Sequence, residues 1–547
     1  MAYELNGSHH ELYRPHNPWE RFTQRHDENH LPEDRFRLVP PPHNVSTSAV
    51  IDALLTHDQV SSPDQPIPRR RQLLRDFLSE AVSGRGLNCH VDEDIVKSSS
   101  SRDIALLDDR QKHEGCAKPI GKQCDDCQIY SNNVTIPNLY LRLKEERIAL
   151  KAEKRIIFIP NLTSAGALAL AATTARRSAT PVRDFIHRYL GREHTFSVSV
   201  TWGFFLEFHI PYHALRPGPP SKDHRYNRGR RLRKSDPLPL QLESGDKEEL
   251  YYHEAQTSSL SWGPDEWFWT ELFLVDTYFG SERNHPTYLT GSPAGNGYDP
   301  PLGGRERLDN PCFDPRQYWL LKLDRRVLQV TEEYTALIET FNQRMEEYAR
   351  KIRRKTEDDS RRTHTQTISN VIETIQIFVD CISGIIETWE TFRRNQISYF
   401  TIHARDKRGF ADRIDRIIRN MSELDRLRRL LLTKRERFRS KLGSLHTVSS
   451  LKQAETAIVQ GENIKTLTEM TVYIAFPLLF TAAIFSMDFV RPEKLPWLVF
   501  FALLLVTSLV NYMIASRRSP YRVWRNCKEW VEEKRGNSAY SSYYRQF

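Results

Sequence analysis

Near its carboxyl end, the chain carries two long apolar runs that contain no charged residue. They cover residues 470–487 and 495–515. As α-helices, which rise 1.5 Å per residue, the runs would be roughly 27–31 Å long, and this matches the hydrocarbon core of a bilayer. The pattern therefore predicts two transmembrane helices. The alternative, two buried helices of a soluble protein, is disfavoured because core helices of this length carry charged or strongly polar residues.

The link between the two runs, residues 488–494, is too short to fold on its own. The two helices are therefore expected to form an antiparallel hairpin, with both flanking segments on one side of the membrane. Five basic residues follow the second run: Arg517, Arg518, Arg522, Arg525 and Lys528. By the positive-inside rule they place the basic tail, residues 516–547, in the cytosol. We expect a multi-pass membrane protein with both termini in the cytosol.

Upstream of the hairpin, residues 316–469 show helical periodicity. Apolar residues recur at alternating spacings of three and four over 320–341 and again over 368–392. A third stripe covers 410–458, and no proline interrupts it before Pro477. Stripes of this kind are typical of long helices that pack side by side as in a coiled coil. We expect a long helical region whose last helix is a stalk that enters the membrane.

Residues 136–315 carry the mixed pattern of an α/β cytosolic domain. The pattern predicts strands at 155–159, 196–200, 204–210, 250–262 and 267–278, and helices at 165–174 and 181–190. An insertion rich in Arg, Lys and Pro covers 216–240. Because Tyr226 is its only aromatic residue available for stacking on bases, we interpret this insertion as a solvated loop rather than a nucleic-acid patch.

The first 135 residues are rich in Pro, His, Asp, Arg and Ser and show no sustained period of 2 or 3.6. Such a segment buries too little apolar surface to offset its chain entropy, so we predict that residues 1–135 are largely disordered. Within them, four residues form an H-x2-C-x7-C-x2-C pattern: His113, Cys116, Cys124 and Cys127. Their types suit tetrahedral zinc, although the central spacing is short. Unpaired surface thiols are the alternative.

Composition narrows the possible functions. The mean hydropathy of the 547 residues is −0.59, so most of the chain faces water and its apolar character is concentrated in the hairpin. A net charge of +9 fits contact with an anionic membrane face, and we expect no nucleic-acid partner. The chain has no Gly-rich phosphate loop, no H-E-x-x-H and no G-x-S-x-G. We therefore expect neither an enzyme nor a bound cofactor.

The residues around the end of the first apolar run resemble the signature of the CorA magnesium-transporter superfamily. In that family a proline-containing first transmembrane helix ends in Gly-Met-Asn, and the following loop contains Pro-Glu. The corresponding positions here are Pro477, then Ser486, Met487 and Asp488, then Pro492 and Glu493. The upstream runs RDFIHRYL and DEWFWTELFLVDTYFGSE look like those of fungal CorA-like proteins. The resemblance covers roughly residues 138–530.

This resemblance implies a funnel-shaped homopentamer that conducts Mg²⁺ or a related divalent cation. The Gly-Met-Asn turn would form the outer selectivity ring, where neutral oxygens meet the waters of a cation that dehydrates reluctantly. Asp488 would instead place a ring of carboxylates there, which attracts cations more strongly and holds them longer. Several copies are required, because two helices cannot enclose a water-filled path.

With Asp488 facing the axis, counting back by the helical period gives the candidates for the pore lining. These are Ile484, Phe480, Thr481 and Tyr473. This face is mostly apolar, so the pore would gate by dewetting or be closed permanently. The sequence thus leaves two interpretations open: a Mg²⁺ transporter or channel that acts as a homo-oligomer, and a non-conducting, CorA-derived membrane scaffold or regulatory protein.

Overall fold

The structure is a computed structural model of the full chain. It describes residues 19–24, 45–56, 69–82, 90–99, 104–112, 127–147, 150, 152–241, 249–280, 299–307, 311–353, 362–401, 407–486 and 497–516. The chain divides into two compact units, Met1–Leu442 and Gly443–Phe547. The first unit contains the sheet, and the second contains the apolar helices.

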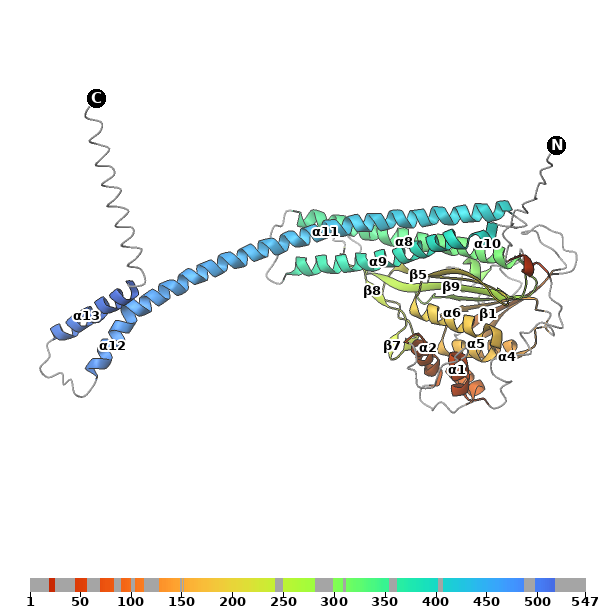
Figure 1. The fold of residues 1–547 in the computed structure, drawn as a ribbon, viewed down its shortest axis with the longest axis horizontal. Coiled ribbons are helices and arrows are strands. Elements are labelled where there is room, and N and C mark those ends of the chain that lie inside the picture. Colours follow the sequence, from red (N-terminus) through yellow and green to blue (C-terminus); the bar gives the residue numbers. More distant parts are fainter. Residues whose placement is uncertain are drawn as a thin grey trace, which may run out of the picture. The chain divides into compact units, whose positions relative to one another are not determined.

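An eight-stranded sheet forms the centre of the first unit (Figure 1). The strand order is β2-β1-β3-β10-β9-β5-β4, and β8 pairs with the first part of β9. β10 runs parallel to β3, and the other pairs are antiparallel. The strands are β1 (Ile104–Gln111), β2 (Gln128–Thr135), β3 (Lys154–Pro160), β4 (Thr195–Val200), β5 (Phe204–Pro217), β8 (Ser235–Pro237), β9 (Leu250–Gly263) and β10 (Trp269–Val275). A separate short ribbon pairs β6 (Tyr226–Asn227) with β7 (Arg230–Arg231).

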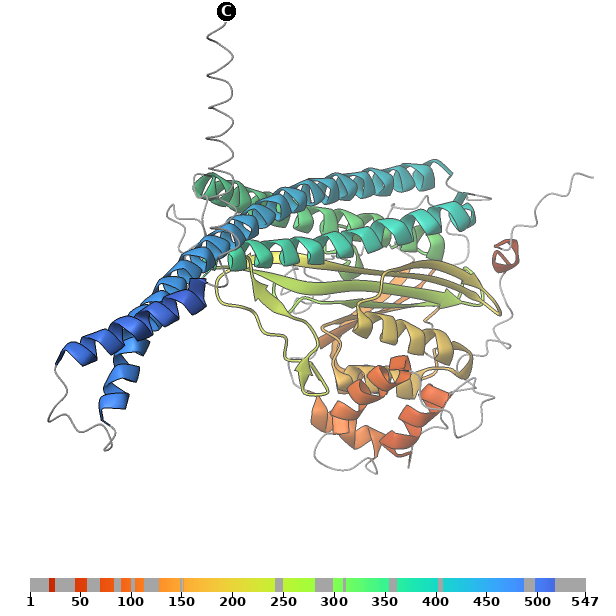
Figure 2. The ribbon, with the colours of Figure 1, turned by 60° about the vertical axis from the view of Figure 1, so that its left-hand side comes forward.

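Helices cover both faces of this sheet. α8 and α9 pack on one face, and α4, α5 and α6 lie on the other (Figure 1). α1, α2 and α3 pack on the outside of α5 and α6, where Figure 2 shows them beyond the second helical layer. The helices of this unit are η1 (Glu20–Phe22), α1 (Thr47–Thr56), α2 (Arg69–Ser79), η3 (Glu80–Val82), α3 (Val91–Ser98), α4 (Ile136–Lys144), α5 (Ser164–Thr173), η4 (Arg176–Ser178), α6 (Ala179–Gly191), η5 (Pro300–Leu302), α8 (Pro315–Ile352), α9 (Thr363–Asn395), α10 (Ser398–Thr401) and the first part of α11 (Lys407–Met470).

The long helices begin where their sequence supplies a cap. α8 starts at Pro315, whose missing N–H is no loss in the first turn. The carboxylate of Asp314 accepts hydrogen bonds from the backbone N–H groups of Arg316 (2.9 Å) and Gln317 (3.3 Å). α8, α9 and α11 coincide with the three periodic segments. Arg416 of α11 donates to Asp324 of α8 (3.0 Å) and Arg435 of α11 donates to Gln376 of α9, so the prediction of long helices packed side by side is confirmed.

The contact between α8 and the sheet combines aromatic packing with a buried ion pair. The ring of Trp319 stacks on Phe400 with 5.0 Å between centroids and meets Phe208 edge-on at 5.7 Å. Nearby, Lys322 of α8 pairs with Glu271 of β10, and both side chains are fully buried. Because neither charge faces water, each depends on the other for its solvation. The pair thus links α8 directly to the sheet.

Within 136–315, the predicted strands and helices are confirmed, but the predicted start of the fold is wrong. β1 lies between β2 and β3 inside the sheet, and α1 to α3 bury apolar residues in the same core as α5 and α6. The error has a physical cause: the charges of β1 are paired rather than solvated. Asp109 binds Arg155 through two hydrogen bonds of 2.8 and 2.9 Å, and Asp108 binds Arg110. The polar composition of this segment was therefore a poor guide to whether it folds.

Two helical glycines differ in the space around them, and this gives a matched test. A Cβ at Gly384 of α9 would lie 2.6 Å from the ring of His194, which donates from Nε2 to the carbonyl oxygen of Cys381 (3.1 Å). A Cβ at Gly443 of α11 would meet nothing within 4 Å. We expect Gly384→Ala to lower the free energy of unfolding by about 1–3 kcal/mol. Gly443→Ala should raise it by roughly 0.5–1 kcal/mol.

Chemical denaturation of the two alanine variants, side by side with the unsubstituted chain, checks this expectation. Equal effects of the same sign at both positions would contradict the close packing of α9 against His194.

Candidate functional site

The second unit is built from the apolar runs. α11 passes directly into the π-helical turn η6 (Thr471–Ala475) and α12 (Phe476–Phe485), and α13 (Trp497–Ser516) follows. Among the described residues, the continuous helix Lys407–Ile484 is the one that is long and apolar enough to cross a membrane. Only 11% of its most apolar stretch is buried within the structure. The described apolar part of α13, Leu498–Tyr512, is shorter.

The π turn follows from Pro477. In a π turn each carbonyl accepts from the N–H five residues later, as Thr471 does from Phe476. The partner of Val472 would then be Pro477, which has no N–H. Asn511 of α13 supplies the missing donor, because its Nδ2 lies 3.3 Å from the carbonyl oxygen of Val472. A polar side chain of one apolar helix thus completes the backbone hydrogen bonding of the other.

α12 and α13 pack against each other in opposite directions. Asn511 lies beside Val472, and Thr507 lies beside Thr481 with 3.5 Å between their hydroxyl oxygens. The hydroxyl of Thr481 also donates to the carbonyl oxygen of Pro477 (2.7 Å). Pro477 and Thr481 are therefore on the side of α12 that α13 covers.

The structure separates the predicted pore-lining residues into covered and exposed positions. Thr481 is fully buried, whereas Tyr473 and Phe480 are 37% and 46% exposed and Leu479 is 70% exposed. Ile484 is intermediate. Thr481 is therefore the most covered of these candidates. Because Asp488, from which the helical count starts, lies outside the described residues, the pore lining stays a prediction from the sequence.

The remaining predicted site residues are only partly described. Ser486 follows the last turn of α12, where its N–H donates to the carbonyl of Ala482 (3.0 Å) and its hydroxyl donates to that of Ala483 (2.9 Å). Met487, Asp488, Pro492 and Glu493 lie outside the described residues.

The same holds for most of the zinc pattern. His113, Cys116 and Cys124 lie outside the described residues, and Cys127 directly precedes β2. Among the residues that the structure describes, no group of three or more His, Cys, Asp or Glu side chains is placed to hold a metal ion. The zinc site therefore stays a prediction from the sequence.

Removing the donor of Asn511 should weaken the pairing of the two apolar helices. Asn511→Leu leaves the Val472 carbonyl without its partner in an apolar setting, and such interhelical hydrogen bonds contribute about 0.6–2 kcal/mol in membranes. We expect a lower midpoint of thermal unfolding in detergent. Ser508→Ala, a polar-to-apolar change on the same helix, is the control and should change the midpoint less. Equal midpoints for both variants would contradict this role of Asn511.

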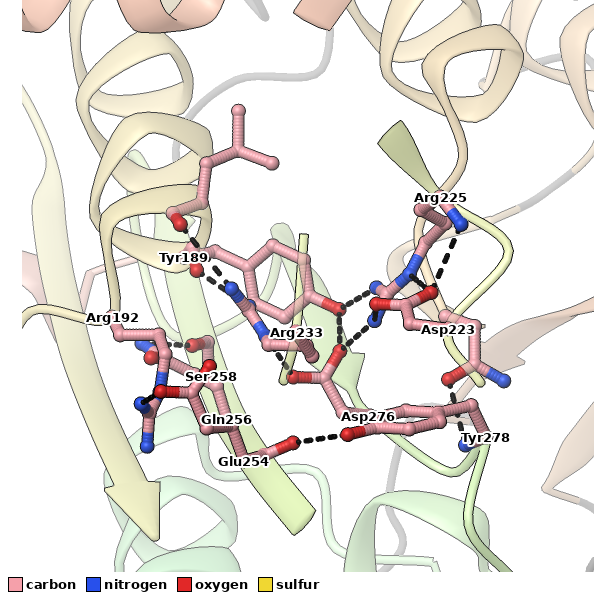
Figure 3. Close-up of polar contacts among 12 residues, drawn as sticks. Tyr189, Arg192, Asp223, Arg225, Arg233, Glu254, Gln256, Ser258, Asp276 and Tyr278 are labelled. Carbon is pink, nitrogen blue, oxygen red and sulfur yellow. Dashed lines mark hydrogen bonds and ion pairs between the residues drawn. The ribbon is translucent and has the colours of Figure 1, made fainter. Parts of the chain in front are cut away.

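In the first unit, the insertion predicted as a solvated loop carries a buried ion network (Figure 3). Nε of Arg233 donates to Asp276 just after β10 (2.7 Å), and Arg225 lies 2.8 Å from the other carboxylate oxygen. Asp223 binds the same Arg225 through two side-chain hydrogen bonds of 2.8 Å. The hydroxyl of Tyr189 on α6 accepts from Arg225 and donates to Asp276. The prediction of a solvated loop is therefore wrong for this part of the insertion.

The electrostatics of this network favour its ionised form. Burial alone would raise the pKa of the Asp276 carboxyl, but the guanidinium groups of Arg233 and Arg225 outweigh it and hold that pKa at about 2. Burial raises the pKa of the Tyr189 hydroxyl above its usual range. Because the carboxylates and guanidinium groups pair with one another, the network holds the insertion on α6 and the sheet. Its arrangement indicates a structural role.

Along the chain, a domain with a mixed sheet is thus followed by long helices and by two apolar helices in contact. A comparison with known protein families found a match. Residues 312–516, which include α8 to α13, match the family model of the CorA-like Mg²⁺ transporter protein. Over these residues the chain is similar to the CorA-like Mg²⁺ transporter family. No curated protein matches the chain.

Proposed function

We propose that the protein is a transmembrane transporter or channel for Mg²⁺ or a related divalent cation and that it acts as a homo-oligomer. The observation that carries this proposal is the family match, because it covers the segment that contains η6, α12 and α13. The family supports divalent-cation transport in general. The proposal further includes conduction through this chain, a pentameric assembly, and a transmembrane hairpin with both termini in the cytosol.

The contact between α12 and α13 supports the hairpin. The two apolar helices run in opposite directions and satisfy each other's polar groups through Asn511 and Thr507. In hydrocarbon, backbone carbonyls must find their partners within the protein. A pair of helices that supplies its own missing donor is suited to that environment.

The exposed side of α12 supports self-association. Ile474, Leu478 and Leu479 are all at least half exposed. Leu479 is two residues from both Pro477 and Thr481, so it lies on the side of the helix opposite to them. In this proposal the side centred on Leu479 meets the other copies around the axis, and Thr481 does not.

Cysteine substitution tests this orientation. Leu479→Cys should form disulfide-linked dimers in oxidised membranes, whereas Thr481→Cys should not, because α13 covers it. The unsubstituted chain serves as the background. Cross-linking that is as efficient at 481 as at 479 would overturn the proposed orientation.

Uptake of Mg²⁺ into proteoliposomes tests the function itself. The purified full chain should give saturable uptake that increases with an inside-negative potential, since each Mg²⁺ carries two charges. Liposomes without protein give the background. Protein that assembles into oligomers but adds nothing to the background would overturn the transport proposal.

One observation favours the second candidate, a non-conducting scaffold. The exposed side of α12 consists of apolar side chains, which line a path that water wets poorly. If the protein is such a scaffold, it should assemble into oligomers in the proteoliposome experiment and give no Mg²⁺ uptake above background.

A further inference from the structure

A small cavity lies in the first unit, between the sheet and the helices α4, α5 and α6. Its volume is about 80 Å³, well above the roughly 10–15 Å³ that a single water requires. One wall is apolar and includes Ile157 of β3 and Leu272 of β10. The lining also includes the polar residues Arg155 of β3, Trp262 of β9 and Ser178, which directly precedes α6. The cavity can hold several waters or one small ligand.

Three donor groups in this lining have no acceptor among the residues that the structure describes. Arg155 uses Nε and Nη2 to bind Asp109, and this leaves its Nη1 without a hydrogen bond. Ser178 is 1% exposed, and its hydroxyl has no hydrogen-bond partner. Trp262 is 8% exposed, and its indole N–H donates to none of the described residues. Of the three, the Ser178 hydroxyl is a fully buried atom without a partner, which is costly, so this hydroxyl above all points to a ligand that accepts hydrogen bonds.

The charge around the cavity indicates the sign of that ligand. The lining contains two arginines, Arg147 and Arg155, and no acidic residue among those described. Ser178 is the N-cap of α6, a helix of 13 residues, so the positive end of the helix dipole points toward this lining. Arg147 is held in place by donating to Thr270 (2.8 Å) and to the carbonyl of Trp269 (2.9 Å). These features favour an anion.

We propose that this cavity binds a small oxyanion, the phosphate or carboxylate group of a compact metabolite. The oxygens would accept from Arg155 Nη1, from the Ser178 hydroxyl and from the Trp262 indole, and charge-assisted bonds of this kind are the strong ones. The apolar wall would contact a short carbon skeleton. The site is independent of ion conduction, because its residues belong to the sheet domain.

Thermal unfolding of the full chain in detergent tests this site with inorganic phosphate and acetate as probes. EDTA keeps Mg²⁺ out of the assay, and NaCl keeps the ionic strength constant. At about ten times its Kd, a ligand that binds only the folded protein shifts the folding equilibrium roughly tenfold. We expect a saturable rise of the midpoint with one of the two probes, and the effective probe identifies the group.

Two variants locate the effect. Ser178→Ala removes the unpartnered hydroxyl, and Trp262→Phe removes the indole donor but keeps an aromatic ring. Both should fold, and both should lose most of the midpoint rise. Ser199→Ala on β4, which is exposed and does not line the cavity, should keep the full rise. A rise of equal size in Ser178→Ala and in the unsubstituted chain, or no rise with either probe, would overturn the proposal.

A charge placed in the cavity provides a second measurement. Ser178→Asp puts a carboxylate where we place the oxyanion, so this variant should fold as stably as the unsubstituted chain and should no longer respond to the probe. A variant that unfolds at a much lower temperature, or that still responds fully, would show that the cavity does not accept an anion.

Discussion

Asp276→Asn is expected to lower the free energy of unfolding by about 3–5 kcal/mol, the usual cost of removing one partner from a buried ion pair. Asp276 and Arg233 are both fully buried, and the carboxylate also faces Arg225 at 2.8 Å. Asparagine keeps the shape but removes the charge that offsets two desolvated guanidinium groups. Denaturant unfolding, followed by the signal of the aromatic residues in the sheet domain, measures this loss.

An exposed ion pair provides the control for Asp276. Glu423 and Arg426 pair on the surface of α11, so Glu423→Gln should change stability by no more than about 0.5 kcal/mol. Because the folded pKa of Asp276 is lowered from 3.8 to about 2, its contribution is fully present above pH 3.8 and is lost as the pH falls through 2. A loss as small as that of the control would show that the network does not hold the insertion in place.

Asp488→Lys is expected to abolish Mg²⁺ uptake. If the copies surround a common axis, Asp488 brings like charges together at the pore mouth, where they attract a cation, and lysine would repel it. Asp488→Asn restores the neutral residue of the family's triplet, so it should retain uptake with a lower cation affinity. Uptake into proteoliposomes, at equal amounts of reconstituted protein, compares the variants across a range of Mg²⁺ concentrations.

A charge reversal elsewhere separates a local effect from a general one. Glu423→Lys makes the same change on the exposed surface of α11 and should leave uptake unchanged. Equal transport by wild type, Asp488→Asn and Asp488→Lys would show instead that Asp488 is a solvated residue at the membrane boundary.

The parts of the fold that depend on local pattern could be predicted. Helical periodicity identified α8, α9 and α11, a short β-branched run identified β3, and a run rich in Phe identified the first half of β5. β1 was missed because its segment IALLDDRQ places three consecutive charged residues in the second half of a buried strand. Their partners, such as Arg155 and Asp299, are distant in sequence, and local composition cannot reveal them.

The same limit applies to the insertion after β5. Arg225 and Arg233 belong to a run of basic residues that has the composition of a solvated loop. Their burial depends on Tyr189 and Asp276, which lie 36 and 43 residues away in the chain. The oxyanion cavity also escaped sequence reasoning, because no motif links Ser178 to Arg155 and Trp262.

In the candidate pore, the sequence indicated the helices but not their orientation. Periodicity shows which residues share a side of α12, whereas the position of α13 decides which side is covered. The helical count from Asp488 made Thr481 a candidate for the lining, and in the structure its hydroxyl donates to Pro477 and approaches Thr507. The triplet Ser486, Met487 and Asp488 stays a prediction from residue types, because Met487 and Asp488 lie outside the described residues.

The π turn η6 also resets the angular phase of the long helix. It spreads one extra residue over a turn, so side chains before Thr471 are rotated by about 100° relative to the positions that an uninterrupted α-helix would give them. A row of residues that lies on one side of α12 is therefore shifted by one position in the sequence where it continues on α11. Deleting a single residue from Thr471–Ala475 would remove this offset. The side chains of α11 would then be rotated about the helix axis by about 100° relative to those of α12.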